Sequence, residues 1–298
     1  MIEAILHDGS RLPVEATGDG PDLLLPVNPV PIEGPQAEEM RKWGADPALG
    51  RTLIDGLCDR YRVVAFDYEG HVLRSPKPDT LTPDNVVQDL LAVADAAGAG
   101  RFAYYGYSWL ALAGMQLAIR TDRLSALIMG GYPPIDGPYK EMLSVTTATY
   151  KMSAASREAP QAPRSAGSSD DIDWSTVEVA MSVDQTRQFM TLYGALQNFD
   201  DRTVQRRISC PRLCFAGTAD RIEYGERWGN VSVDIAGPLL RRGRELEAYG
   251  WDVRTLDGLD HTQAMQADGV LPLIRPWLDA RIREQRPDDA AISDDDSR

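Results

Sequence analysis

The sequence predicts an α/β fold in which helices flank a mostly parallel, eight-stranded sheet. Short, unbroken apolar runs alternate with segments of helical periodicity along the 298 residues. A strand that is apolar along its whole length is typical of a parallel sheet whose two faces are both covered by helices. The apolar fraction of 43% is sufficient for a large core, and this length is compatible with one α/β domain that carries an insertion.

Eight segments are expected to form the strands of this sheet. The first two flank the turn Asp8-Gly9-Ser10 and are expected to form a hairpin. The other six are short apolar runs and therefore candidates for buried strands. The eight segments are residues 2–6, 12–16, 22–26, 62–66, 101–105, 124–129, 212–216 and 252–256.

Helical periodicity is clearest between residues 82 and 98. Thr82 is expected to cap this helix, Pro83 to occupy its first position, and Gly98 to end it. Residues 27–46 are rich in proline, glycine and acids and are expected to form a loop. The other expected helices cover residues 47–60, 110–119, 139–152, 182–198, 238–249 and 271–284.

The alternation of strands and helices is interrupted once, between residues 135 and 205. We therefore predict that residues 1–134 and 206–285 form one core domain in two parts and that residues 135–205 form a helical cap over the sheet. Within this cap the polar residues 159–173 are expected to form a mobile loop. The acidic residues 286–298 are expected to be a disordered tail.

Charge and composition argue against several classes of protein. The net charge of −14 argues against nucleic-acid binding, which needs a basic face. No apolar run approaches the roughly 20 residues of a membrane span, and the acidic N-terminus does not resemble a secretory signal. Cys58, Cys210 and Cys214 are interpreted as reduced core thiols and not as metal ligands, which favours a cytoplasmic location.

The most informative segment is Gly106-Tyr107-Ser108-Trp109. A serine between a short strand and a helix, with glycine two positions before it, is the nucleophile-elbow pattern, in which a sharp turn exposes the hydroxyl above the sheet. Gly106 is expected to let the strand and the helix cross closely. Leu110 stands where this pattern usually has a second glycine, and the same tripeptide also occurs in ordinary strand–turn–helix corners.

A base and an acid are expected at the same sheet edge as Ser108. His261 follows the last predicted strand and Asp220 follows the strand before it, and open α/β sheets bind ligands at this edge. A serine hydroxyl needs a base to take its proton, and imidazole titrates near neutrality. A carboxylate would hold the other ring nitrogen. The alternatives for the acid are Asp136, Asp257 and Asp260, and the other histidines, His7 and His71, are interpreted as structural.

Three further segments carry a resemblance to a known family. Residues 67–75 resemble D-x-x-G-H-G-x-S, residues 216–222 resemble the G-x-x-D that delivers an acid, and residues 258–261 resemble the G-x-x-H that delivers a base. Together with the chain order Ser, Asp, His, they make residues 1–285 resemble the α/β-hydrolase-fold superfamily, in its serine-hydrolase type with a helical cap.

The resemblance implies a Ser108–His261–Asp220 triad and two backbone N–H donors for an oxyanion. One donor would be Trp109, and the other, by position, Asn28 in the loop after the third strand. The superfamily usually has His-Gly in that loop, whereas this chain has Pro26-Val27-Asn28-Pro29, in which the prolines cannot donate. The side-chain amide of Asn28 is an alternative group to face the pocket, and Leu110 is expected either to widen the elbow or to line the pocket floor.

The resulting hypothesis is a serine hydrolase that acts on an ester, lactone, thioester or amide of a small, largely apolar molecule. Tyr107, Leu110 and Tyr132 are expected to line the substrate pocket. One alternative is a non-hydrolytic enzyme of the same fold, such as a lyase, cyclase, acyltransferase or cofactor-free oxygenase, and another is a non-catalytic ligand-binding protein. We expect no cofactor, no metal, no nucleic acid and no membrane partner. The oligomeric state stays open, with a homodimer among the alternatives.

Overall fold

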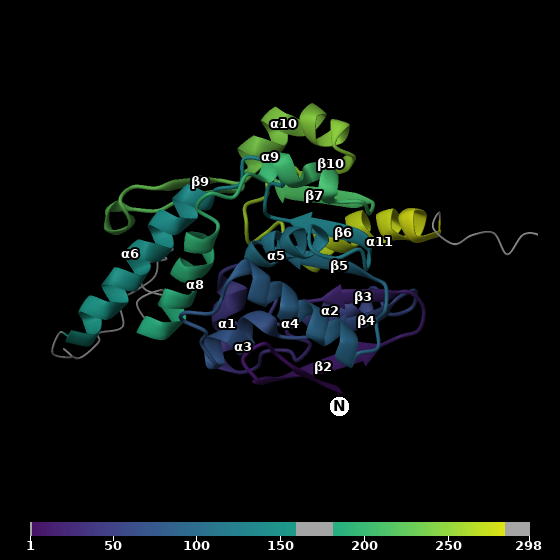
Figure 1. The fold of residues 1–298 in the computed structure, drawn as a ribbon, viewed down its shortest axis with the longest axis horizontal. Coiled ribbons are helices and arrows are strands. Elements are labelled where there is room, and N and C mark those ends of the chain that lie inside the picture. The colour runs from purple at the N-terminus through teal and green to yellow at the C-terminus, as the bar shows by residue number, and fades with distance from the viewer. Residues whose placement is uncertain (1, 159–180, 284–298) are drawn as a thin grey trace, which may run out of the picture.

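The eight predicted strands form one sheet. A computed structural model describes residues 2–158 and 181–283, and in it the strand order is β1-β2-β4-β3-β5-β6-β7-β10 (Figure 1). β1 and β2 form an antiparallel hairpin, β2 is also antiparallel to β4, and the remaining neighbours are parallel. The strands are β1 (Ile2–Ile5), β2 (Arg11–Thr17), β3 (Asp22–Leu25), β4 (Arg62–Ala65), β5 (Phe102–Tyr107), β6 (Leu124–Gly130), β7 (Arg212–Gly217) and β10 (Trp251–Leu256). The predicted fold class is therefore confirmed.

Helices cover both faces of the sheet, and each face has its own core. Alternate side chains of β5 belong to different cores: Phe102 and Tyr104 pack in one, and Ala103 and Tyr105 in the other. Helices α4, α5 and α10 contribute to the first core, and α2 and α11 to the second. These helices are α2 (Leu49–Asp55), α4 (Pro83–Ala96), α5 (Trp109–Ala118), α10 (Ala236–Ala248) and α11 (Ala267–Arg283). Burial on both faces explains why the strands are apolar along their whole length.

The ends of α4 follow from its sequence. The hydroxyl oxygen of Thr82 accepts a hydrogen bond from the backbone N–H of Asn85, and Pro83 occupies the first turn, where no N–H is needed. Gly98, with φ of 69°, leaves the helix in the left-handed conformation that glycine adopts at low cost. The predicted start and end of this helix are confirmed.

Two helices near the carboxyl edge of the sheet were not predicted. The expected loop over residues 27–46 contains α1 (Pro35–Lys42), whose only buried residue is Ala37, so no apolar stripe marks it in the sequence. Directly after β4, the carboxylate of Asp67 accepts from the N–H of Gly70 and begins α3 (Tyr68–Arg74). Outside the main sheet, β8 (Arg221–Glu223) and β9 (Ser232–Asp234) form a two-stranded antiparallel sheet. The short 3-10 helix Glu226–Trp228 lies in the connection between these two strands.

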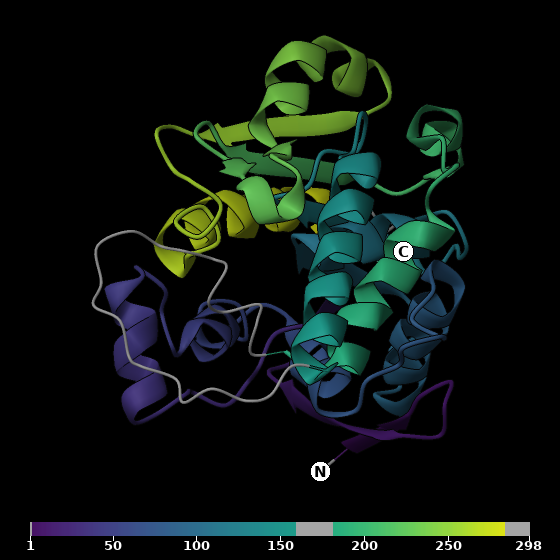
Figure 2. The same cartoon turned by 90° about the vertical axis from the view of Figure 1, so that its left-hand side faces the viewer.

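The segment between β6 and β7 is helical where it is described. α6 (Tyr139–Glu158) and α8 (Val183–Ala195) lie side by side and project from one side of the sheet (Figures 1 and 2). The short α9 (Asp201–Val204) and the 3-10 helix Gln205–Arg207 lead back to β7. The predicted loop 159–173 and tail 286–298 lie outside the described residues. Among the described helices, none combines the length and the hydropathy needed to cross a bilayer.

Candidate active site

The turn between β5 and α5 presents Ser108 at the carboxyl edge of the sheet. Ser108 has φ of 56° and ψ of −131°, a backbone conformation that is strained for a residue other than glycine. Its N–H donates to the carbonyl oxygen of Gly130 at 2.8 Å, which ties the turn to β6. A Cβ on Gly106 would lie 2.3 Å from the carbonyl oxygen of Leu110, so only glycine permits this crossing of strand and helix.

Two loops bring an imidazole and a carboxylate to Ser108. The Nδ1 of His261 lies 2.9 Å and 3.1 Å from the two carboxylate oxygens of Asp220, and its Nε2 lies 3.1 Å from the hydroxyl oxygen of Ser108. Asp220 is 0% exposed. Its carbonyl oxygen accepts from the N–H groups of Ile235 and Ala236, which holds the loop after β7 against the start of α10.

This hydrogen-bonded chain has the arrangement needed to activate a hydroxyl. A carboxylate on Nδ1 favours the tautomer whose proton is on that nitrogen, which leaves Nε2 free to accept a proton from Ser108. The other predicted acids bond elsewhere: Asp136 to Arg202 and Arg242, Asp257 to Thr218, and Asp260 to Gln263. The other two histidines also lie outside the chain, because His7 bonds to Asp89 and His71 to Ser10.

Tyr107 connects the nucleophile turn to the histidine loop. Its hydroxyl donates to the carbonyl oxygen of His261 at 2.8 Å, and the centroids of the two rings are 5.1 Å apart. The ring fills the space beside Gly131, where a Cβ would approach it to 2.6 Å. Tyr107 thus holds the backbone of His261 at a defined position relative to Ser108.

The two residues predicted as oxyanion donors, Trp109 and Asn28, both line the cavity that Ser108 lines. Trp109 is the first residue of α5, and an N–H at this position has no acceptor within its own helix. In the loop after β3, no described residue accepts from the N–H of Asn28, while the side-chain oxygen of Asn28 accepts from Val30 at 3.0 Å. The side chain therefore closes a turn of its own loop. A Cβ on Gly50 would lie 1.9 Å from the carbonyl oxygen of Asn28, so α2 and this loop are in close contact.

Ser108 and His261 line a cavity of about 700 Å³ at the carboxyl edge of the sheet. Pro26, Val27 and Asn28 form part of its wall, as do residues of α1, α2 and α3. Of the predicted pocket residues, Tyr107 and Leu110 line this cavity. The described parts of α6 and α8 contribute no lining residue, so the cavity walls that the structure describes come from outside the predicted cap.

The structure does not place Tyr132, the third predicted pocket residue, in the described lining of this cavity. Tyr132 follows β6, but it is 2% exposed and is absent from the described lining of the cavity. Its ring instead packs edge-on against that of Tyr139 at the start of α6, with centroids 6.0 Å apart. The apolar surface of α6 therefore draws this side chain away from Ser108 and into the core.

Solved structures share this architecture. An enol-lactonase from Burkholderia xenovorans matches with a TM-score of 0.60 and 19% identity, over 93% of this chain and 99% of that one. An esterase from Thermogutta terrifontis matches with a TM-score of 0.57 and 18% identity, over 94% and 97% of the two chains. An epoxide hydrolase from Vigna radiata matches with a TM-score of 0.54 and 15% identity, over 93% and 97%.

This chain has the α/β-hydrolase fold. The three similar structures are each aligned over nearly their whole length. No protein-family model matches the chain, and no curated protein sequence does. At these levels of identity the likeness establishes the architecture, and the chemistry has to be argued from the residues at that edge.

The cavity wall includes a glutamate that was not predicted from the sequence. Glu69, on the unpredicted helix α3, lines the cavity, and its Oε1 accepts from the indole Nε1–H of Trp109 at 3.0 Å. Burial raises the pKa of the Glu69 carboxyl and the charge of Asp67 adds to this, whereas the hydrogen bond from Trp109 opposes it. Glu69 lies within the segment that resembles D-x-x-G-H-G-x-S, which is the signal that could have indicated it.

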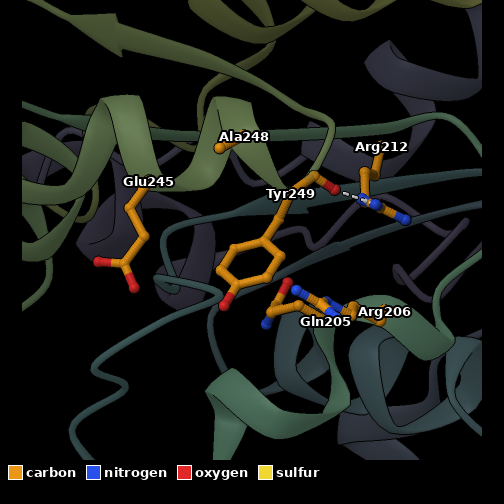
Figure 3. A pocket seen from close by; sticks show the side chains of 6 residues that line it. All are labelled: Gln205, Arg206, Arg212, Glu245, Ala248 and Tyr249. Atoms are coloured by element: carbon orange, nitrogen blue, oxygen red, sulfur yellow. Dashed lines mark hydrogen bonds between the residues drawn. The ribbon is translucent and has the colours of Figure 1, made fainter.

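A second cavity lies at the opposite, amino edge of the strands. It has a volume of about 540 Å³ and is lined by residues around the start of β7 and the end of α10 (Figure 3). Arg212 donates to the carbonyl oxygens of Ile208 and Tyr249, and Glu245 pairs with Arg202 and Arg242. None of the predicted site residues lines it.

Among the described residues, no group of histidine, cysteine and acidic side chains has the arrangement of a metal site.

Proposed function

We propose that this protein is a serine hydrolase that cleaves the ester, lactone, thioester or amide bond of a small, largely apolar molecule. The observation that supports it is the hydrogen-bonded chain from Asp220 through His261 to Ser108, at the wall of a cavity of about 700 Å³. A cavity of this size is within the usual range for small-molecule ligands. Two solved structures with the same fold are an enol-lactonase and an esterase, which is consistent with this class of reaction.

The proposed reaction has two halves. The hydroxyl oxygen of Ser108 attacks the substrate carbonyl carbon while Nε2 of His261 takes its proton, and the N–H groups of Asn28 and Trp109 stabilise the oxyanion. Collapse of this intermediate breaks the bond to the leaving group, which receives the proton from His261, and leaves an acyl group on Ser108. A water molecule then attacks the acyl carbon by the same steps, releases the acid and restores Ser108. Asp220 stabilises the imidazolium in both halves.

The loop after β3 supplies the second proposed oxyanion donor, and the non-hydrolytic alternatives are separated from hydrolysis by experiment. The side-chain oxygen of Asn28 accepts from the N–H of Val30, which fixes the side chain within its own loop. In the proposed reaction the backbone N–H of Asn28 is the donor to the oxyanion, as the position after β3 implies. Product analysis in ¹⁸O-labelled water separates the alternatives. Hydrolysis places one solvent oxygen in the acid product, whereas a lyase or cyclase reaction incorporates none.

The direct test is labelling with a fluorophosphonate probe, which forms a covalent bond to an activated serine. We expect the wild type to be labelled and Ser108→Ala to be unlabelled, because the probe depends on Ser108 and on its base. Ser209→Ala is a matched control, since Ser209 is an exposed serine outside the cavity lining. Absence of labelling in folded wild-type protein, or persistent labelling of Ser108→Ala, would contradict the proposal.

We also propose that the protein acts in the cytoplasm and needs no cofactor. Cys58, Cys210 and Cys214 are free thiols. Burial raises the pKa of the Cys210 thiol to about 11 and raises that of the Cys214 thiol as well, as expected for inert core thiols. Unpaired cysteines are typical of proteins in a reducing compartment.

A further inference from the structure

Glu69 places a carboxylate in the wall of the proposed substrate cavity, next to the nucleophile turn. It belongs to α3, which follows β4 at the same sheet edge as Ser108. Its Oε1 accepts from the indole of Trp109, the residue that directly follows Ser108. The indole is held from its other sides by Phe189 and Tyr68, with ring centroids 5.5 Å and 5.9 Å away. The position of the Glu69 carboxylate relative to the nucleophile is therefore well defined.

The charge of Glu69 has no cationic partner among the residues that the structure describes. Arg74, the arginine that lines the same cavity, donates to Asp67 at 3.0 Å. Among the described residues, the only donor to Glu69 is the neutral indole of Trp109, which bonds to Oε1 and leaves Oε2 without a described partner. The Glu69 side chain is exposed and lines the cavity, so a ligand in the cavity can reach it.

The other two carboxylates of the cavity wall are occupied within the protein. Asp46 accepts from the N–H of Ala48 and from the hydroxyl of Thr52. Asp67 caps α3 and pairs with Arg74. Glu69 is thus the carboxylate of this wall that can still accept hydrogen bonds from a ligand.

A ligand that fills the cavity excludes water from Oε2 of Glu69, and removing the water from a carboxylate oxygen that has no other partner costs free energy. The protein atoms packed around this exposed side chain already raise the pKa of its carboxyl. A ligand that brings a hydrogen-bond donor would offset the cost, and a cationic donor would offset more of it than a neutral one. A methyl group in the same place would leave Oε2 desolvated and without a partner.

We propose that Glu69 selects substrates that carry a hydrogen-bond donor beside the reacting carbonyl, with a protonated amine preferred over a hydroxyl and a hydroxyl over a methyl group. This inference rests on the proposed function, because it takes the cavity beside Ser108 as the substrate site. It adds the chemical class of the substrate: a small amino-substituted carboxylic ester or a close relative. Glu69 acts on substrate choice in this proposal, while proton transfer to and from Ser108 belongs to His261.

The test is a series of p-nitrophenyl esters whose acyl chains differ only in length and in the terminal group, which is ammonium, hydroxyl or methyl. We expect kcat/KM of the wild type to favour the ammonium ester of the best length over its methyl counterpart by about 10- to 100-fold. Glu69→Gln should lose most of this preference, since glutamine can still accept from Trp109 but has no charge. Glu38→Gln, which removes an exposed carboxylate of α1 outside the cavity lining, should retain it.

Two outcomes overturn the inference. One is a wild type that prefers the methyl ester at every chain length, a result that does not depend on whether any variant folds. The other is a Glu69→Gln variant that melts like the wild type and keeps the full preference for the ammonium ester.

Calorimetric binding to Ser108→Ala separates this inference from the proposed function. Alkylammonium ions and alkanols of matched length need no reaction to bind, so their relative affinities report on the cavity alone. Suppose that the fluorophosphonate does not label the wild type, that Ser108→Ala binds the ammonium ions more tightly than the alkanols, and that adding Glu69→Gln removes this difference. Hydrolysis then fails and the role of Glu69 stands. If labelling succeeds and the affinities are equal, the role of Glu69 fails and hydrolysis stands.

Discussion

Replacement of Asp220 by asparagine tests the proposed catalytic chain most directly. Both carboxylate oxygens of Asp220 lie within 3.1 Å of Nδ1 of His261, and the side chain is 0% exposed. Asparagine has the same shape, so Asp220→Asn should fold. It removes the negative charge beside the imidazolium, and its amide can donate to Nδ1, which places the ring proton on Nε2 and leaves no base facing Ser108.

The size of the effect follows from the separation of the charges. Two unit charges about 4 Å apart interact by about 4 kcal/mol at the effective dielectric constant of a partly buried site. Loss of this interaction in the transition state corresponds to a fall of about 10³-fold in kcat. KM should change little, because Asp220 does not line the cavity and makes no contact with the substrate in the proposed reaction.

The assay is hydrolysis of the best ester of the p-nitrophenyl series, with the rate of fluorophosphonate labelling as a second readout. Asp257→Asn is the matched control, since Asp257 is an exposed acid of the same loop as His261 and bonds to Thr218. It should keep wild-type kcat. A loss smaller than about tenfold in Asp220→Asn, or an equal loss in Asp257→Asn, would refute the assignment of Asp220 as the acid of the chain.

Two further predictions concern stability. Gly106→Ala should lower the free energy of unfolding by about 1–3 kcal/mol in urea titrations, because the new Cβ would lie 2.3 Å from the carbonyl oxygen of Leu110; a variant as stable as the wild type would contradict the close crossing of β5 and α5. Arg202, together with Arg242, holds the pKa of the Asp136 carboxyl below its usual range. The stabilisation from this carboxylate is therefore fully present above about pH 4 and is lost as the pH falls through its lower value in the folded state. Asp136→Asn, which tolerates the φ of 57° at this position, should accordingly be less stable than the wild type at neutral pH and approach it in acid; a difference that persists unchanged in acid would contradict the ion pair.

The strands and the order of the site residues could be read from the sequence because each depends on a local pattern. A strand buried on both faces must be apolar throughout, so all eight strands were visible. Ser108, Asp220 and His261 each follow a predicted strand, and the parallel topology alone brings such positions to one edge. The structure places their side chains within hydrogen-bond distance of one another.

The features that the sequence did not predict depend on contacts between distant segments. α1 was not predicted because Ala37 is its only buried residue, so no apolar stripe marks the helix in the sequence. Glu69 reads as an ordinary polar residue until α3 is placed against the indole of Trp109. Tyr132 follows a strand as a pocket residue would, but its ring packs against Tyr139 at the start of α6. The direction of the Tyr132 side chain thus depends on a helix that the position after β6 does not reveal.

The hydrogen bond from Tyr107 to the carbonyl oxygen of His261 crosses 154 residues of sequence. It joins the residue before the nucleophile to the main chain of the base, although the nucleophile and the base follow different strands, β5 and β10. A phenylalanine at position 107 would fill the same volume and remove this hydrogen bond. The loop that carries His261 would then keep its contact with the ring but lose its hydrogen bond to the turn that carries Ser108.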